Sequence, residues 1–419
     1  FQGCTSLETS TIPVIGNKNQ VHFGYIFGAA QASNNSRYVP ASLKTVTITG
    51  GTVVGLNAFT GCANIHTIDL PETINQIINI SFLGCTSLTA ADINGNVTFI
   101  GNNAFQNCVA LTEIVIPDSV QTLGLNAFYG CTSLTSAKIG NGVTALQNSL
   151  FQLCAKLTSV TIPSTVTTMG TYVFNGCTSL ASITLPAALT SIGESAFNGC
   201  TALTGIAIPD NVTTLGMNVF NGCTKLAQVN IGAGIKTSTR SAFHGCTSLE
   251  NIIIPDNVTN LGGLAFSGCS NLKTITLSEN LTAIGSNAFY QCYSLNNVLI
   301  PEGVKSIGCN AFRDCRTFTE IAVPLSVTSI GAGAFNGCTS LEKLTIPFVG
   351  TADNSRNNNN FGYIFGTNKF ENHQKFVPET LKTVIITGGE TIADSAFFGC
   401  AEIVNITLPD TLVTIGDEA

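Results

Sequence analysis

Cysteine recurs in this sequence at one fixed interval of 23 residues. Thirteen of the sixteen cysteines form a single series without a slip, and a phenylalanine stands three residues before each of them. The series is Cys62, Cys85, Cys108, Cys131, Cys154, Cys177, Cys200, Cys223, Cys246, Cys269, Cys292, Cys315 and Cys338. The chain is therefore a string of copies of one short unit, C-T-S-L-x-x-I-x-I-P-x-x-V-x-x-I-G-x-x-A-F-x-G, and not a set of ordinary globular domains.

The first half of each unit has the pattern of a short parallel strand. In the copy LENIIIP, Leu249, Ile252 and Ile254 alternate with polar or variable residues, which predicts one buried face. Pro255 has no N–H and cannot continue a ladder that is paired on both sides, so we expect the strand to end there.

The second half of each unit brings the chain back to the next cysteine. Val258 and Leu261 are expected to face inward on a second extended segment, Gly262 to turn the chain with a positive φ, and Ala265 and Phe266 to lie on a short helical or 3₁₀ turn. A period of 20 to 30 residues rich in Leu and Ile is typical of a leucine-rich-repeat solenoid. We predict such a solenoid, nominally α/β but β-rich: a right-handed, curved stack of coils with parallel sheets and short helical or 3₁₀ turns.

The periodic cysteine has three possible explanations. A metal site needs clustered ligands such as C-x-x-C, which the sequence lacks. A disulfide between neighbouring coils is within reach, but side chains in register point in parallel and each thiol has two equivalent neighbours. We favour small buried side chains stacked on their own copies. Cys309 breaks the pattern, and we expect it near the surface, as a free thiol or bridged to Cys315.

Two similar interruptions break the regular repeat. Each contains FGYIFG, an Asn-rich stretch, a V-P pair and LKTV-ITGG, and from Phe23 and Phe361 onward the two copies are offset by a constant 338 residues. We predict a single solenoid over 1–419 that is cut in mid-repeat at both ends, with regular repeats over 52–346 and duplicated modules at 13–51 and 347–389.

The FGYIFG segments allow two interpretations. They could display aromatic rings to a ligand, with Tyr25 and Tyr363 as contacts, or their aromatics could form a satellite core that holds an enlarged loop on the solenoid. Three aromatics in six residues are more often buried, so we favour the second. The Asn-rich stretches at 34–37 and 354–360 are then expected to be mobile tips.

Composition and motifs exclude several functions. Charged residues make up only 10% of the chain, the net charge is −7, and no Lys/Arg block or long apolar run occurs, so we expect neither nucleic-acid binding nor membrane insertion. The four histidines fall at unrelated repeat positions, and no hydrolase, zinc-protease or phosphate-loop motif is present. We predict no enzyme activity, no cofactor and no metal.

A column of outward-facing residues on the first strand is the candidate ligand surface. It holds the residue between the two inward Ile positions of each coil, and it is mostly small and neutral. The candidates in it are Lys138, Thr161, Thr184, Asn230, Ile253, Thr276 and Leu299. A long, shallow ribbon suits an extended partner better than a small substrate. The alternative, which we favour slightly, is that Thr and Ile stand there only for their β-propensity.

The unit C-T-S-L-x-x-I-x-I-P-x-x-V-x-x-I-G-x-x-A-F-x-G-C resembles the BspA-like leucine-rich repeat of bacterial and some protozoan surface proteins. Minor departures are Ile78, Gln147 and Thr239 for the glycine, and Ala91 and Ala137 for an inward Ile. The resemblance implies a monomeric cell-surface or secreted bacterial scaffold that binds an extracellular protein or glycan, as in adhesion to host matrix proteins such as fibronectin or in coaggregation. The alternative is a carbohydrate- or peptide-binding appendage of a larger surface enzyme.

Overall fold

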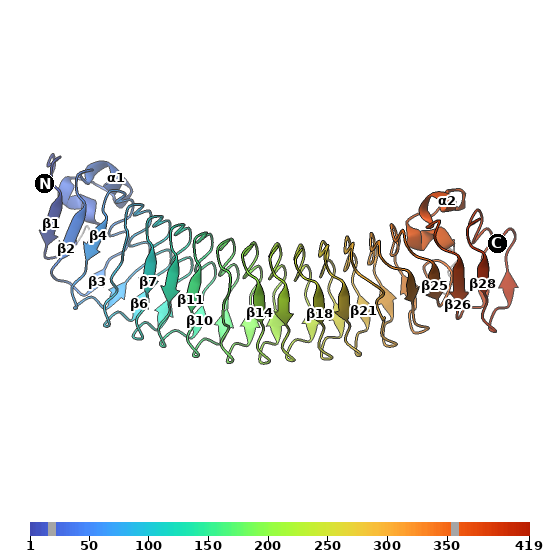
Figure 1. Cartoon of the computed structure of the whole chain (residues 1–419). Coiled ribbons are helices and arrows are strands. Elements are labelled where there is room, and N and C mark those ends of the chain that lie inside the picture. The colour runs from blue at the N-terminus through green and yellow to red at the C-terminus, as the bar shows by residue number, and fades with distance from the viewer. Residues whose placement is uncertain (16–21, 353–359) are drawn as a thin grey trace. The chain divides into compact units, whose positions relative to one another are not determined.

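The computed structural model describes residues 1–15, 22–352 and 360–419. It contains two compact units, Phe1–Asn211 and Val212–Ala419. In each unit the chain winds into successive coils, and the strands of neighbouring coils pair in parallel (Figure 1). With about 16 turns in total and few short helices, the chain is a parallel β-solenoid of the predicted leucine-rich-repeat class. That the units form one uninterrupted solenoid with the predicted module boundaries stays a prediction.

The first unit contains two sets of short strands and one group of short helices. Its first strands pair in the orders β1-β2-β4 and β7-β9-β11, and its second strands include β3-β5-β6-β8 and β10-β12-β13. The elements are β1 (Thr9–Ile12), η1 (Phe23–Phe27), η2 (Ala32–Asn34), α1 (Asn35–Tyr38), β2 (Thr45–Ile48), β3 (Val53–Val54), β4 (Thr67–Asp69), β5 (Gln76–Ile77), β6 (Phe99–Ile100), β7 (Glu113–Val115), β8 (Thr122–Leu123), β9 (Ser136–Lys138), β10 (Ala145–Leu146), β11 (Ser159–Thr161), β12 (Thr168–Met169), β13 (Ser191–Ile192) and β14 (Gly205–Ala207).

The second unit repeats this arrangement. Its first strands include β18-β20 and β23-β25-β26-β28, and its second strands include β17-β19-β21-β22-β24 and β27-β29. The elements are β15 (Thr214–Leu215), β16 (Gln228–Asn230), β17 (Thr237–Ser238), β18 (Asn251–Ile253), β19 (Asn260–Leu261), β20 (Thr274–Thr276), β21 (Ala283–Ile284), β22 (Ser306–Ile307), β23 (Glu320–Ala322), β24 (Ser329–Ile330), β25 (Lys343–Ile346), η3 (Phe361–Phe365), η4 (Phe370–Asn372), α2 (His373–Phe376), β26 (Thr383–Ile386), β27 (Thr391–Ile392), β28 (Asn405–Thr407) and β29 (Thr414–Ile415).

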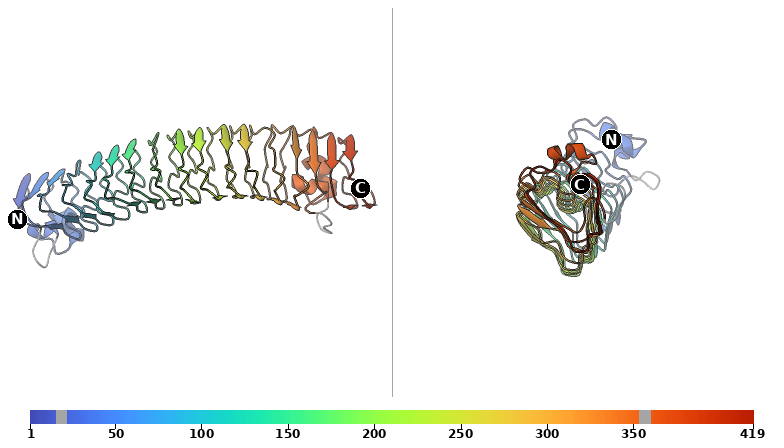
Figure 2. Two further views of the ribbon diagram at one scale, coloured as in Figure 1. Left: turned by 90° about the horizontal axis from the view of Figure 1, so that it is seen from below. Right: turned by 90° about the vertical axis from the view of Figure 1, so that its right-hand side faces the viewer.

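The first strands are in register with their copies one coil along. Strand β18 pairs with β20 so that Asn251 lies opposite Thr274 and Ile252 opposite Ile275, a shift of one full repeat. Within each unit these strands stand side by side along one side of the coils (Figure 2). Ile252 is buried while Ile253 is 69% exposed, so the predicted alternation is confirmed.

The ladder phenylalanines form stacks through the core of each unit. The rings of Phe105 and Phe128 lie 5.3 Å apart at 9° in the first unit, and those of Phe266 and Phe289 lie 5.7 Å apart at 6° in the second. All four are essentially inaccessible to solvent. A parallel offset stack follows because the coils are in register, and it adds to the apolar area that each ring buries.

The ladder cysteines are buried free thiols, as the packing interpretation predicts. At least eleven of the thirteen also donate a hydrogen bond to a backbone carbonyl, which the sequence did not reveal. The Sγ of Cys85 donates to the carbonyl oxygen of Phe59 at 3.1 Å, and Cys269 donates to that of Phe243 at 3.1 Å. Burial raises the pKa of the Cys85 thiol to about 12, with a smaller opposing effect of a backbone hydrogen bond. A thiol therefore fits here because it is small, stays neutral and satisfies a buried carbonyl.

Two predictions about the turn of each coil are wrong. Gly262 does not have a positive φ; that conformation belongs to Leu264 (60°) and Gly268 (74°). A Cβ on Gly262 would instead lie 2.6 Å from the backbone of the preceding coil at Ser238, so the glycine is required by a close approach. The Ala265–Phe266 segment is a series of turns without helix, and in the described residues all helices lie in the two modules.

Candidate binding surfaces

The outward column of the first strands is exposed in both units. In the first unit Lys138, Thr161 and Thr184 are exposed. In the second unit Asn230, Ile253, Thr276 and Leu299 are exposed, with Ile253 at 69% and Leu299 at 80%. Thr184 and Leu299 lie in coils whose first segment is not a regular strand. The second unit therefore presents two large apolar side chains in one column.

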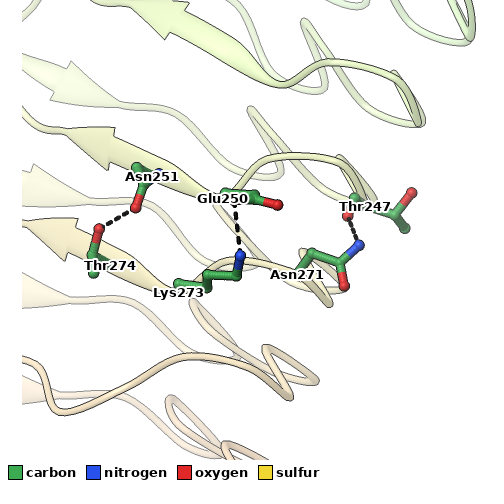
Figure 3. A network of polar contacts seen from close by, with 6 residues as sticks. All are labelled: Thr247, Glu250, Asn251, Asn271, Lys273 and Thr274. Atoms are coloured by element: carbon green, nitrogen blue, oxygen red, sulfur yellow. Dashed lines mark hydrogen bonds and ion pairs between the residues drawn. The ribbon is translucent and has the colours of Figure 1, made fainter.

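The polar residues beside this column are paired with their copies in the next coil. Lys273 Nζ lies 2.9 Å from Glu250 Oε2, and the Thr274 hydroxyl donates to the amide oxygen of Asn251 (Figure 3). Both charged side chains are about half exposed, so this ion pair contributes little to stability. The polar side chains beside Ile253 are thus already paired with each other, whereas Ile253 itself stays exposed to solvent.

Beside Leu299, the side chain of Asn297 interrupts the backbone hydrogen bonding between neighbouring coils. In neighbouring coils the backbone N–H groups of Lys273 and Thr274 donate to one carbonyl, that of Glu250. At the corresponding place the Oδ1 of Asn297 accepts from the N–H groups of Thr319 (3.1 Å) and Glu320 (3.2 Å). The side chain thus replaces the backbone carbonyl and interrupts the ladder.

An open groove of about 410 Å³ lies next to this interruption. Its lining includes Leu299, Ala322 and Thr345 from three successive coils, together with the Glu320–Lys343 pair, whose atoms are 3.6 Å apart. The short side chain of Ala322 leaves the space beside exposed Leu299 open. Sequence reasoning placed Leu299 on this face but did not predict the groove.

The phenylalanines of FGYIFG join the main stack of rings. Phe23 is buried and its ring lies 5.1 Å from that of Phe59; Phe361 is buried and lies 4.7 Å from Phe397. The N–H of Phe23 donates to the carbonyl of Ala58 at 2.7 Å, as ladder phenylalanines do in regular coils. The aromatics are therefore core residues, but they continue the main ladder and do not form the expected satellite core.

The two tyrosines project from these helices. Tyr25 is 40% exposed and Tyr363 is partly buried. The prediction that the first Asn-rich stretch is a mobile tip is wrong, because Asn35 begins helix α1 and is completely buried. The second stretch lies outside the described residues apart from Asn360.

Each module places a histidine beside an asparagine, with the two residue types exchanged. His22 Nδ1 lies 2.9 Å from Asn35 Oδ1 in the first module, and His373 Nε2 lies 3.3 Å from Asn360 Oδ1 in the second. The offset of 338 residues aligns His22 with Asn360 and Asn35 with His373. This alignment was available in the sequence and would have revealed the exchange.

The structure also places a cysteine beside a histidine, which the scattered histidines did not predict. Cys400 Sγ lies 3.6 Å from His373 Nδ1, at a cavity of about 350 Å³. Burial raises the pKa of the Cys400 thiol to about 12 and lowers the pKa of His373. The neutral thiol is the wrong form for a nucleophile. Among the described residues no group of three or more His, Cys, Asp or Glu side chains could hold a metal ion.

No helix in the described part of the chain is long and apolar enough to cross a membrane.

Comparisons place the chain among bacterial repeat proteins. The model of the BspA type leucine rich repeat region (6 copies) matches residues 34–157, 144–273, 236–360 and 366–419. A leucine-rich repeat protein from Bacteroides ovatus ATCC 8483 is 30% identical, with a TM-score of 0.70 over 83% of this chain and 88% of that one. A leucine rich cell surface protein from Faecalibacterium prausnitzii A2-165 is 25% identical, with a TM-score of 0.43 over 82% of this chain and 91% of that one. A comparison with curated proteins found no match. This chain belongs to the BspA-type leucine-rich-repeat family.

Proposed function

We propose that this chain is a non-enzymatic binding protein, secreted or displayed on the cell surface, whose first-strand face recognises host matrix proteins or other surface macromolecules. Leucine-rich-repeat folds are typically used for protein binding. The observation that carries the proposal is the exposure of Ile253 (69%) and Leu299 (80%) in one column of the second unit.

These two side chains suit a protein partner. They stand two coils apart, roughly 10 Å at ~4.8 Å per strand, which is a common separation for apolar side chains in one interface. Burying each one completely would contribute about 1.5–3 kcal/mol. The neighbouring ion pair and the paired Asn and Thr side chains form a polar surround that needs little rearrangement.

The test changes only the two apolar residues. Because Thr276 stands in the same column between them, Ile253→Thr and Leu299→Thr are compatible with the fold. Binding of the purified chain and of the double variant is measured on a panel of matrix proteins, including fibronectin, and of glycans. We expect the double variant to lose binding by about ten-fold or more with an unchanged circular dichroism spectrum. Unchanged binding on the whole panel would refute the first-strand face as the site.

The alternative function is a carbohydrate- or peptide-binding appendage of a larger surface enzyme, with Tyr25 and Tyr363 as contacts. It is favoured by one observation: in each FGYIFG segment the phenylalanines are buried while the tyrosine keeps solvent exposure. Tyr25→Ala and Tyr363→Ala in the same panel separate the two functions, because only the alternative predicts that glycan binding depends on these rings.

A further inference from the structure

Two adjacent coils of the second unit depart from the repeat at the residue after the ladder cysteine. The residue after each ladder cysteine is small in every other coil and large in only these two. This position holds Ala63, Thr86, Val109, Thr132, Ala155, Thr178, Thr201, Thr224, Thr247, Ser270, Tyr293, Arg316, Thr339 and Ala401. Since Thr satisfies the fold at this position in most coils, folding alone does not explain Tyr293 and Arg316.

The same two coils also have Tyr290 and Arg313 at the position after the ladder phenylalanine. That position is variable: six other coils have Asn or Gln there and six have other residues, Tyr129 among them. In these two neighbouring coils, the residues after the ladder phenylalanine and after the ladder cysteine form a group that we call the Tyr–Arg block: Tyr290, Tyr293, Arg313 and Arg316. Two of the five arginines and two of the seven tyrosines of the chain lie in it.

The side chains of the block pair across the coils. The guanidinium carbon of Arg316 lies 4.6 Å from the ring centre of Tyr293, and that of Arg313 lies 5.6 Å from the ring centre of Tyr290. The rings hold the planar guanidinium groups in place, which lowers the entropy that a ligand would have to restrict.

The guanidinium groups keep donors for a ligand. Asp314 lies between them, with its carboxylate oxygens 3.8 Å from Arg313 Nε and 3.9 Å from Arg316 Nη2, too far for hydrogen bonds. Arg313 Nε makes no hydrogen bond within the described residues but is buried, so the terminal guanidinium nitrogens are the donors that a ligand can reach. The Arg313 and Arg316 side chains are 43% and 57% exposed.

We propose that the Tyr–Arg block is a second binding site, which takes the carboxylate side chains of an acidic segment of a protein partner. The planar fork of arginine matches a carboxylate with two parallel hydrogen bonds. Tyr and Arg are also the residue types that carry most binding energy in protein interfaces. A glycan is less suited, because sugar rings stack on free aromatic faces and each tyrosine here already has a guanidinium over one face. This site adds a second contact to the proposed function. It rests on that proposal only in assuming that the partner is a protein.

The repeat itself supplies conservative variants. Arg313→Asn and Arg316→Thr introduce residues that stand at the same positions in other coils, as Asn175 and Thr178 do, so the double variant should fold. Arg313→Lys with Arg316→Lys keeps the charges but removes the planar forks. Tyr129→Asn, which changes a tyrosine at the equivalent position of a coil without these arginines, is the matched control.

The probes are a fluorescent oligoglutamate peptide and fluorescent chondroitin sulfate, measured by anisotropy at low salt. We expect Arg313→Asn/Arg316→Thr to weaken peptide binding about ten-fold with an unchanged circular dichroism spectrum. The double lysine variant should lie between this variant and the unmodified chain, and the control should bind normally. No peptide binding by the unmodified chain, or equal binding by the double variant, overturns the proposal. So does an effect confined to chondroitin sulfate, which would identify a glycan site. The Ile253→Thr/Leu299→Thr variant should keep peptide binding, so a failure of the first-strand face is distinguishable from a failure of this site.

Discussion

The Nε2 atom of His373 accepts a hydrogen bond from the backbone N–H of Gly362 at 3.3 Å, where the first module uses the amide oxygen of Asn35 to hold Gly24 at 3.1 Å. A Cβ on Gly24 would lie 2.3 Å from Asn35 Oδ1, and a Cβ on Gly362 would lie 2.4 Å from His373 Cδ2 and 2.8 Å from His373 Nε2. The fold thus requires an acceptor at this position and glycine opposite it. Imidazole and amide both meet the requirement, but only the imidazole titrates.

The second module should therefore lose stability in mild acid. Burial lowers the pKa of His373 from its ordinary value of 6.5, and a proton on Nε2 would abolish its hydrogen bond with Gly362. A group whose folded pKa is lowered contributes its full stability above the unfolded pKa, and this stability falls as pH drops below 6.5. We expect the melting temperature from calorimetry to fall between about pH 7.5 and about pH 5.

The exchange between the modules provides the matched variant. Asn360→His with His373→Asn reproduces the arrangement of the first module, with an acceptor that cannot be protonated at Gly362. We expect this variant to have a shallower pH dependence than the unmodified chain. His66→Asn is the control, since His66 is exposed and its Nδ1 donates to the backbone carbonyl oxygen of Asn64. An unchanged slope in the exchanged variant would contradict the role of His373.

Thiol chemistry tests the cysteine ladder. Cys4 and Cys309 are exposed, Cys400 is partly buried with its thiol pKa raised by burial to about 12, and the thirteen ladder thiols are buried. We expect a thiol reagent at mildly alkaline pH to label two cysteines rapidly in the native protein and sixteen after denaturation without reductant. Cys309→Ser should lower the rapid count by one. A count well below sixteen in the denatured protein would instead show that neighbouring coils are linked by disulfides.

The strict repeat explains why so much of the fold could be predicted. Because every coil stacks in register on its copy, one alternation of inward and outward residues applies to all coils, and Ile252 and Ile253 follow it. The position of the positive φ could not be predicted, because glycine serves two different needs. At Gly262 it avoids the preceding backbone and at Gly268 it adopts a left-handed conformation.

Contacts that do not follow the period were missed. The His–Asn pairs join residues thirteen positions apart within a module, and the Asn297 side chain replaces a backbone acceptor in one coil. The Asn297 contact belongs to one coil and the His–Asn pairs belong to the two modules, so the 23-residue period contains no signal for either of them. The Tyr–Arg block did leave a signal, because Tyr293 and Arg316 are the large residues in a position of small ones.

The stack of phenylalanine rings should be a major source of stability. Phe128 is fully buried, with ring centres 5.3 Å from Phe105 and 5.5 Å from Phe151. Phe128→Ala removes both ring contacts and leaves a cavity, which typically costs about 3–5 kcal/mol. We expect urea unfolding followed by circular dichroism to show this loss, while Tyr129→Asn, next in sequence but partly exposed, costs less than about 1 kcal/mol. Equal effects of the two changes would contradict a stabilising role for the stack.

A small void beside Ala91 should allow stabilisation. Ala91 stands where Ile114 fills the next coil, and it lines an internal space of about 10 Å³ together with Phe82 and Phe105. Ala91→Val adds two methyl groups toward this space, and we expect a gain of about 0.5–1 kcal/mol, smaller than full burial would give because the surroundings have partly closed in. The comparison is Ala90→Val on the exposed neighbouring position, which should change the free energy of unfolding by less than about 0.5 kcal/mol. If Ala91→Val destabilised the chain in urea unfolding, the coil would already be packed tightly around alanine.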